Sequence, residues 1–329
     1  MKDSAIPPST FRLPVFLIGP TAVGKTAVAL GLARRLDAEI VSADSMQVYR
    51  GMDIGTAKPG AAERAAVPHH LIDVVEVSER FDVARYVALA NAAIADIQRR
   101  GKTPLVIGGT GLYLRALTEG LSEAPDADPS LRIELQTLGR KRVFEELQRV
   151  DSKAAERIGP HNFRRLVRAL EISRLTGRKS SDLHREWDRS RLPLMHGLER
   201  DRADLYARCD ARVEVMFRAG LVDEVRSLLS RGLAGNTTAR QALGYKEIIS
   251  HLDGEATLEE TITLVKTRTR QFAKRQLTWF RHQARVAWIH VAASGETKTI
   301  AEHLADRLQK EVRPVADDGT TTGITCGGT

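Results

Sequence analysis

Apolar residues in the first third of the chain recur in short runs that alternate with longer helical patterns. The β-rich runs predict strands at Pro14–Ile18, Glu39–Ala43, His70–Val74 and Pro104–Ile107. A helical period between them predicts helices at Thr26–Leu36 and Phe81–Arg100. Strands alternating with helices are typical of a parallel sheet flanked by helices, so we expect an α/β fold.

The pattern changes near Leu121, and up to Arg202 it is helical with no convincing strand. Within this stretch Asn162 is a predicted helix cap, and Gly177 is a predicted stop. We therefore expect an inserted all-helical domain. Beyond it the pattern predicts three helices and one last strand that returns to the sheet: Leu205–Ala219, Leu221–Arg231, Leu258–Arg285 and Val286–Val291.

These patterns divide the chain into five expected segments. Residues 1–12 and the Gly/Thr-rich residues 313–329 show no apolar periodicity, and we expect both tails to be disordered. Residues 13–120 are the first part of the core, residues 121–202 are the helical insertion, and residues 203–312 complete the core.

The stretch GPTAVGKT fits the phosphate-loop pattern G-x-x-x-x-G-K-[ST]. A predicted strand precedes it and a predicted helix follows it, which is the arrangement that aims backbone N–H groups and a helix N-terminus at an anion. We expect the whole stretch to bind phosphate: Gly19, Pro20, Thr21, Ala22, Val23, Gly24, Lys25 and Thr26.

Asp44 follows the second predicted strand, so it is expected at the carboxyl edge of the sheet, beside the phosphate loop. An acid there can bind Mg²⁺, act as a general base or cap a turn. Ser45, Gln47 and Tyr49 either bind a second substrate or only decorate the loop. A later strand ends in Gly108–Gly111 where an ATPase usually carries an acid, which disfavours a hydrolase. Thr110 in that turn can donate one hydrogen bond.

Composition narrows the class of protein. No apolar run approaches the roughly 20 residues of a membrane helix, and the N-terminus lacks a signal-peptide layout. Two cysteines are too few for a disulfide framework, so we expect a cytoplasmic protein. His69 and His70 are adjacent on a predicted strand and point to opposite faces, which argues against a shared metal ion.

The net charge of +8 is concentrated in two stretches. Residues 261–295 contain no Asp or Glu and seven cations: Lys266, Arg268, Arg270, Lys274, Arg275, Arg281 and Arg285. The second stretch has Glu171 as its only acid among Arg164, Arg165, Arg168, Arg174, Arg178 and Lys179. Such single-sign stretches favour a phosphate-rich partner over an ordinary surface.

The predicted helix Leu258–Arg285 carries an apolar stripe that must pack on something, formed by Ala273, Leu277, Phe280 and Ala284. Cations lie beside this stripe, and Phe272 and Trp279 fall elsewhere around the helix. Cations interleaved with aromatic rings suit single-stranded RNA, although a buried packing role for Trp279 is the alternative.

Several motifs then occur together and in order: GPTAVGKT, DSMQVYRGMDIGTAKP, PHHLID, GGTGLYLRAL, RRLVRALEI, QALGYKE and QFAKRQLTWFR. On these residues the chain closely resembles the bacterial tRNA dimethylallyltransferases, the tRNA isopentenyltransferase family, from roughly Val15 to Val291. It departs from that family at Phe163, where an acid is common, and at Arg178–Ser181, which replaces a Gly-Lys-Pro-like turn.

The resemblance implies transfer of a dimethylallyl group from dimethylallyl diphosphate to the N6 amine of the adenosine 3′ of the tRNA anticodon. Diphosphate would leave from the loop, with Lys25 and Mg²⁺ on Thr26 stabilising its charge, and Asp44 would be the base with Thr21 as its partner. The resemblance places contacts to the anticodon stem-loop at Asp44, Ser45, Met46, Gln47, Thr110, Arg164, Arg165, Arg168, Gln241, Gly244, Tyr245, Lys246, Lys274, Arg275, Gln276, Trp279 and Arg281. We expect a monomer.

Three alternatives remain at this point. A small-molecule kinase would bind ATP in the same loop, and a prenyltransferase acting on free adenine nucleotides would not use the basic C-terminal helices. An RNA-binding protein gated by a nucleotide, without chemistry on the base, would leave Asp44 superfluous.

Overall fold

The described residues form a six-stranded sheet in which every strand pairs in parallel with its neighbours. The computed structural model describes residues 13–121, 124–183, 192–293 and 297–312. The strand order is β3-β2-β4-β1-β5-β6. The strands are β1 (Val15–Ile18), β2 (Ala38–Ala43), β3 (His69–His70), β4 (Thr103–Gly108), β5 (Met195–Glu199) and β6 (Val286–His290). The predicted parallel α/β fold is therefore confirmed.

Each face of the sheet is covered by a separate apolar core, because alternate side chains of a strand point to opposite faces. Phe16 and Ile18 face a core with α3 (Val83–Arg99), α10 (Leu221–Ser230) and α11 (Tyr245–Leu252). Val15 and Leu17 face the other core, with α1 (Lys25–Arg35), α9 (Arg202–Arg218) and α13 (Thr297–Val312). Two further helices of this part are α2 (Ala61–Ala66) and α4 (Gly111–Glu119).

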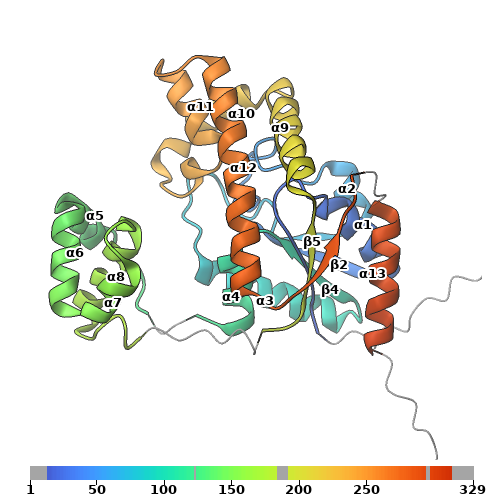
Figure 1. Cartoon of the computed structure of the whole chain (residues 1–329), viewed down its shortest axis with the longest axis horizontal. Coiled ribbons are helices and arrows are strands. Elements are labelled where there is room, and N and C mark those ends of the chain that lie inside the picture. The colour runs from blue at the N-terminus through green and yellow to red at the C-terminus, as the bar shows by residue number, and fades with distance from the viewer. Residues whose placement is uncertain (1–12, 122–123, 184–191, 294–296, 313–329) are drawn as a thin grey trace, which may run out of the picture. The chain divides into compact units, whose positions relative to one another are not determined.

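The long helix α12 (Leu258–Gln283) lies against α9, as Figure 1 shows. Its predicted stripe is confirmed as its packing face: Ala273, Phe280 and Ala284 are fully buried, and Leu277 is half-buried. The helix begins at a capping box between Thr257 and Glu260, and it ends just before β6. Among the described residues, no helix is long and apolar enough to cross a membrane.

The chain divides into two compact units, one formed by residues 1–117 with 193–329 and the other by residues 118–192. The second unit has four helices within its described residues, around an apolar core of its own: α5 (Pro129–Thr137), α6 (Gly139–Val150), α7 (Ser152–Ile158) and α8 (Phe163–Thr176). The absence of a strand up to Arg202 was a wrong expectation, because β5 belongs to the sheet. Its sequence MHGLE carries His, Gly and Glu, which hide the strand pattern.

Both departures from the family pattern lie in the second unit, and each makes contacts that stabilise it. Phe163, where an acid is common, is half-buried and packs against the core of this unit. In the replaced turn, Ser180 Oγ and Ser181 N donate to Asp151 Oδ2 at 2.9 and 2.7 Å. Asp151 also caps α7 through Ala154 N, so the turn and the helix share one buried carboxylate.

The segment after β3 differs from the predicted strand His70–Val74. The observed strand has only two residues, and the backbone of Leu71 and Asp73 adopts positive φ angles of 63° and 55°. Asp73 accepts from Lys58 and Arg64, and the backbone of residues 73–75 bonds Gln47 and Val48 instead of continuing along β2. The two predicted terminal tails, residues 1–12 and 313–329, lie outside the described residues.

Candidate active site

The phosphate-loop pattern forms a tight turn between β1 and α1. Gly19 and Gly24 have φ angles of +152° and +106°, and a Cβ on Gly19 would lie 2.8 Å from the carbonyl oxygen of Leu198. Both positions therefore require glycine. Thr26 lies in the first turn of α1, whose N-terminus faces the loop. The sequence prediction of strand, loop and helix is confirmed.

Lys25 turns back into its own loop. Its Nζ donates to the carbonyl oxygens of Gly19 and Pro20 at 2.9 and 2.8 Å. The pKa of Lys25 is lowered to about 7, chiefly by burial and then by the charge of Arg212, with the charge of Asp44 acting in the opposite direction. A bound anion would raise the pKa of this lysine again and stabilise its charged form.

Three arginines that the sequence did not single out hold the loop from outside. Arg200 Nε donates to Val23 O, and Arg208 Nε donates to Ala22 O, both at 3.0 Å. Arg212 approaches the Thr21 hydroxyl at 3.5 Å, and burial lowers the pKa of its guanidinium. The i, i+4 spacing of Arg208 and Arg212 on one helix face was the available signal.

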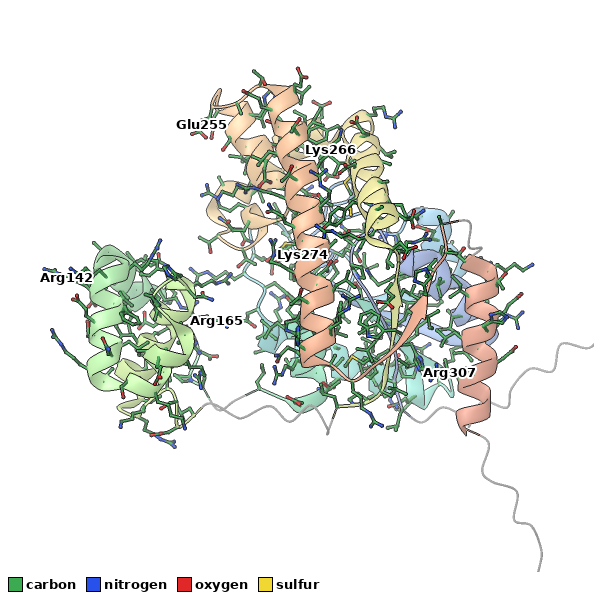
Figure 2. All side chains as sticks on the ribbon, viewed as in Figure 1. Arg142, Arg165, Glu255, Lys266, Lys274 and Arg307 are labelled. Carbon is green, nitrogen blue, oxygen red and sulfur yellow. The ribbon has the colours of Figure 1, made fainter. Side chains whose placement is uncertain are left out.

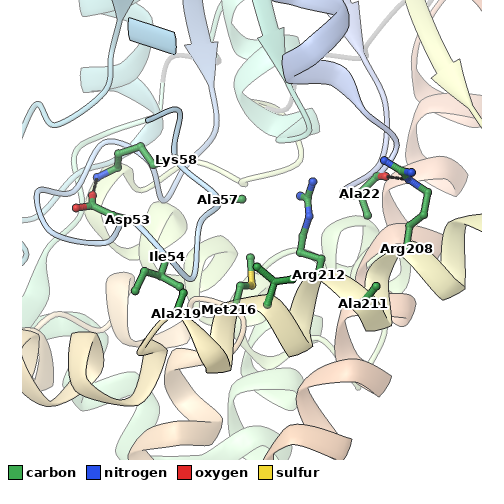
Figure 3. Close-up of a pocket in the computed structure, with 11 residues that line it drawn as sticks. Ala22, Asp53, Ile54, Ala57, Lys58, Arg208, Ala211, Arg212, Met216 and Ala219 are labelled. Carbon is green, nitrogen blue, oxygen red and sulfur yellow. Dashed lines mark hydrogen bonds and ion pairs between the residues drawn. The ribbon is translucent and has the colours of Figure 1, made fainter. Parts of the chain in front are cut away.

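The two arginines of α9 border a cavity of about 610 Å³ next to the loop. Figure 3 shows Arg212 projecting from α9 toward the space between Ala22 and Ala57. The remaining walls are mostly apolar and come from the same helix and from the loop after β2. Lys58 also lines the cavity, where it is paired with Asp53, so the two arginines are the unneutralised cations among its described lining residues. Such cations beside mostly apolar walls suit a ligand with an anionic head and a hydrocarbon tail.

Asp44 lies at the carboxyl end of β2, as expected. Its Oδ1 accepts from the backbone N–H groups of Met46 and Gln47 at 2.8 and 3.3 Å. Burial raises the pKa of Asp44, while these two hydrogen bonds and the charges of Lys25 and Lys58 lower it in opposition. Asp44 and Lys25 therefore sense each other's charge, and the structure brings the predicted base next to the predicted phosphate loop.

The turn after β4 is tied to the turn after β2. Thr110 N donates to Ala43 O at 3.2 Å, and the Thr110 hydroxyl accepts from Ser45 N at 3.1 Å. Gln47 is engaged by its own loop, since its side chain bonds Ser42 and the carbonyl of Thr56. Ser45, Met46 and Gln47 are half-buried at the rim of the site.

The loop after Asp44 is fixed by two charged groups that the sequence analysis missed. Lys58 Nζ is nearly enclosed and donates to Tyr49 O, Asp53 and Asp73. Glu224 of α10 accepts from three successive backbone N–H groups, those of residues 53, 54 and 55, at 2.7 to 3.2 Å. Its Oε1 also accepts from the Tyr245 hydroxyl at 2.6 Å.

Two residues expected at the RNA lie instead inside the protein. Tyr245 is fully buried, and its hydroxyl is used by Glu224. Gln276 is 7% exposed, and both ends of its amide bond the backbone of other loops. The expectation that these two side chains contact RNA directly is therefore wrong. The motifs QALGYKE and QFAKRQLTWFR mix buried with exposed positions, which a motif alone cannot separate.

Nearby positions of the same motifs differ in exposure. Gly244 is buried and begins α11 with a φ of +90°, so its predicted RNA contact is corrected as well. Gln241 and Lys246 are exposed and remain predictions. Lys274 and Arg275 are exposed on α12 (Figure 2 shows Lys274) and border, with half-buried Trp279, a second cavity of about 690 Å³.

Residues 261–295 contain no acid, but in the folded protein several of their cations pair with acids from other elements. Four such pairs are Lys266 with Glu214, Arg268 with Glu247, Arg270 with Asp210 and Arg281 with Glu199. Folding therefore supplies the acids that this segment lacks. Arg281 stays exposed beside Glu199, so its contact with RNA remains a prediction.

The second basic stretch divides in the same way. Within the helical unit, Arg168 donates to Glu171 and to Pro125 O, and Arg174 pairs with Glu134 and Glu146. These contacts give Arg168 a structural role within the unit, and its contact with RNA remains a prediction. Arg164 and Arg165 are exposed on α8 (Figure 2 labels Arg165), and their RNA contact stays a prediction.

The donor set limits which metal the site can hold. In the part of the chain that the structure describes, no three His, Cys, Asp or Glu side chains gather into a metal cluster. The Thr26 hydroxyl and the Asp44 carboxylate are hard oxygen donors. Mg²⁺ suits such a site, because it keeps several waters and takes its other ligands from substrate phosphates.

Comparisons with known proteins agree on one family. The family model of IPP transferase matches residues 47–283. A tRNA dimethylallyltransferase of Anaeromyxobacter dehalogenans is 52% identical over 84% of this chain and 92% of its own length. A full-length tRNA isopentenylpyrophosphate transferase of Bacillus halodurans superposes with a TM-score of 0.66 at 42% identity, covering 90% and 97% of the two chains. A eukaryotic dimethylallyltransferase acting on tRNA gives a TM-score of 0.74 at 28% identity, covering 93% and 81%.

Proposed function

Because this chain belongs to the IPP transferase family, we propose that it is a tRNA dimethylallyltransferase that works as a monomer. It transfers the dimethylallyl group of dimethylallyl diphosphate to the N6 amine of the adenosine 3′ of the anticodon, and diphosphate leaves. The observation that carries this proposal is that Lys25 and Arg212 lie at a phosphate loop next to the half-buried carboxylate of Asp44.

The cations act on the leaving group. Breaking the bond between the allylic carbon and oxygen leaves negative charge on diphosphate, and fixed positive groups stabilise that charge as it forms. Lys25 donates to the carbonyl oxygens of Gly19 and Pro20, and Arg212 approaches the next residue, Thr21, so both cations lie at the loop and can meet the same anion. Arg200 and Arg208 contribute by holding the carbonyls of Val23 and Ala22 away from it.

Asp44 acts on the nucleophile. The N6 amine of adenine is a weak nucleophile because its lone pair is delocalised into the ring, and it must lose a proton as the new carbon–nitrogen bond forms. One oxygen of Asp44 is occupied by two backbone N–H groups, which leaves Oδ2 to accept that proton. The Thr21 hydroxyl lies in the phosphate loop beside Arg212, where it can orient either the amine or the departing oxygen.

A divalent cation fits the hard oxygen donors of the site, and we propose Mg²⁺ with Thr26 as its protein ligand. When bound, it supplies additional positive charge at the diphosphate oxygens. The protein residues keep their roles around it, because Lys25 and Arg212 bind the anion from the loop side.

The adenine must leave its stack to reach this site, which costs less in an anticodon loop than in a duplex. Exposed Lys274 and Arg275 and half-buried Trp279 form a cationic and aromatic strip on α12 that suits such a strand. A small-molecule kinase is less well supported, because β4 ends in Gly108 without an acid. Relatives that are described as acting on tRNA also disfavour a free-nucleotide acceptor.

The test is to incubate the pure protein with unmodified tRNA, Mg²⁺ and dimethylallyl diphosphate, and to analyse digested nucleosides and anticodon fragments by mass. We expect one adenosine per tRNA to gain a five-carbon prenyl group, at the position 3′ of the anticodon. Prenylated free adenosine monophosphate with unmodified tRNA would contradict the proposal.

A further inference from the structure

One side chain of α12 reaches through the core to two loops of the site. The amide oxygen of Gln276 accepts from Thr21 N at 2.8 Å, and its amide nitrogen donates to Gly109 O at 3.0 Å. These partners lie 255 and 167 residues away in the chain. The Gln276 side chain therefore joins two loops that are far from it, and from each other, in the sequence.

The chemistry of the two partners selects an amide at this position. Thr21 offers a backbone donor and Gly109 offers a backbone acceptor, and the primary amide of Gln276 presents a carbonyl acceptor and an N–H donor on two separate atoms, so one neutral group serves both loops at any pH. The fit is close: a Cβ on Gly109 would lie 2.2 Å from the Gln276 amide nitrogen. Only a residue without a side chain at position 109 leaves room for this amide.

Each bonded loop carries one half of the proposed chemistry. The Thr21 end continues into the phosphate loop and the hydroxyl that Arg212 approaches. The Gly109 end continues into Thr110, whose hydroxyl holds the backbone of Ser45 next to Asp44. A displacement of the Gln276 amide would therefore change the distance between the leaving-group side and the base side.

We propose that Gln276 is a positioning residue that fixes the diphosphate loop against the Gly108–Gly111 turn, and that it does not contact RNA. This inference rests on the proposed function, since it takes the loop to bind diphosphate. Gln276 also sits beside the exposed Lys274 and Arg275 on the same helix, so one turn of α12 serves the loop from its buried side and presents cations on its outer side.

The first experiment replaces the amide by a side chain of similar length, Gln276→Met. Binding of inorganic diphosphate with Mg²⁺ is measured by calorimetry, tRNA binding is measured separately, and exchange of the Thr21 amide hydrogen is followed on the peptide that contains it. We expect diphosphate affinity to fall at least tenfold, tRNA affinity to stay within twofold, and Thr21 exchange to accelerate. Gln271→Met, an exposed position of the same helix, is the control and should leave diphosphate affinity unchanged.

A second variant guards against a merely structural effect. In Gln276→Glu a protonated carboxyl can accept from Thr21 N and donate to Gly109 O, whereas its carboxylate cannot donate. We expect the ratio of its diphosphate affinity to that of the wild type to approach one as the pH falls, and to drop as the pH rises. A lasting defect in packing would give a ratio that does not depend on pH.

The outcomes separate the two claims. A wild type that fails to bind diphosphate would overturn both the proposed function and this inference. A wild type that binds it, together with a folded Gln276→Met variant of equal diphosphate affinity, would overturn this inference alone. Loss of tRNA affinity with intact diphosphate binding would instead return Gln276 to the RNA interface.

Discussion

Lys25 is bonded to two carbonyl oxygens of its own loop, so an incoming anion must compete for its ammonium group. Its low pKa makes that exchange favourable, since an anion stabilises the charged form that burial disfavours. Asp44 has the opposite need, because burial raises its pKa while its role as base requires the ionised form. The two residues moderate each other's titration.

Lys25→Ala should reduce kcat/KM for the prenyl donor by a factor of hundreds or more. Loss of one fixed donor to a developing charge typically costs about 3–4 kcal/mol of transition-state stabilisation. Initial rates with saturating tRNA measure this effect. Lys298→Ala, at an exposed position of α13, is the control and should retain the wild-type rate. A loss below threefold in Lys25→Ala would remove this lysine from the mechanism.

Asp44→Asn should lower the single-turnover rate by roughly 10²–10⁴-fold, the usual range for loss of a general base. The amide keeps the shape of the carboxylate and can still accept from Met46 N, so tRNA and diphosphate affinities should remain close to those of the wild type. Rapid-quench measurements with both substrates bound separate chemistry from binding. A near-wild-type rate would assign the proton to another group.

Diphosphate binding should take up protons above neutral pH. The pKa of Lys25 is about 7 in the free protein, so at pH 8 most molecules carry a neutral lysine that must be charged when the anion binds. Calorimetry in buffers of different ionisation enthalpy should show close to one more proton taken up by the wild type than by Lys25→Ala. Equal uptake by the two proteins would contradict the lowered pKa.

Individual elements differ in how well the sequence predicts them. The phosphate loop was predicted because its strand, glycines and helix are contiguous, and the packing stripe of α12 was predicted because it repeats along one helix. The sequence analysis missed Arg200, Arg208 and Arg212, because each contacts the loop from a position more than 170 residues away in the chain. The short strands β3 and β5 were misjudged because pairing partners, and not local pattern, define them.

Folding pairs some cations of α12 with acids, so fewer cations are unpaired on its exposed face than its sequence suggests. Lys274 and Arg275 are exposed, whereas Arg281 is paired with Glu199. Lys274→Gln with Arg275→Gln should therefore weaken tRNA binding and lower its salt slope by about one unit per lost phosphate contact. Diphosphate affinity should not change.

The matched control for this pair removes two exposed cations from the helices α1 and α13, Arg34→Gln with Lys298→Gln. It should leave both the affinity for tRNA and its salt slope at wild-type values. Affinities at several salt concentrations, with melting curves alongside, decide the comparison. If the two double variants lose affinity equally, the effect comes from net charge and not from α12.

At the scale of the whole molecule, the site results from the order of the strands. β2, β4 and β1 are adjacent and parallel, so the turns that follow them meet at one edge of the sheet. These turns carry Asp44, Gly109 and the phosphate loop, and α9 and α12 add Arg212 and Gln276 from distant parts of the chain. The predicted helical insertion is a separate compact unit with its own core and its own exposed arginines.

The central claim is that the phosphate loop holds a leaving group and not a nucleotide to be hydrolysed. The most direct measurement is to quantify prenylated tRNA and released diphosphate in one reaction that contains dimethylallyl diphosphate, Mg²⁺ and unmodified tRNA but no nucleoside triphosphate. We predict equal amounts of both products, and a rate that added ATP does not increase. A strict requirement for ATP, with ADP formed in step with product, would contradict the account.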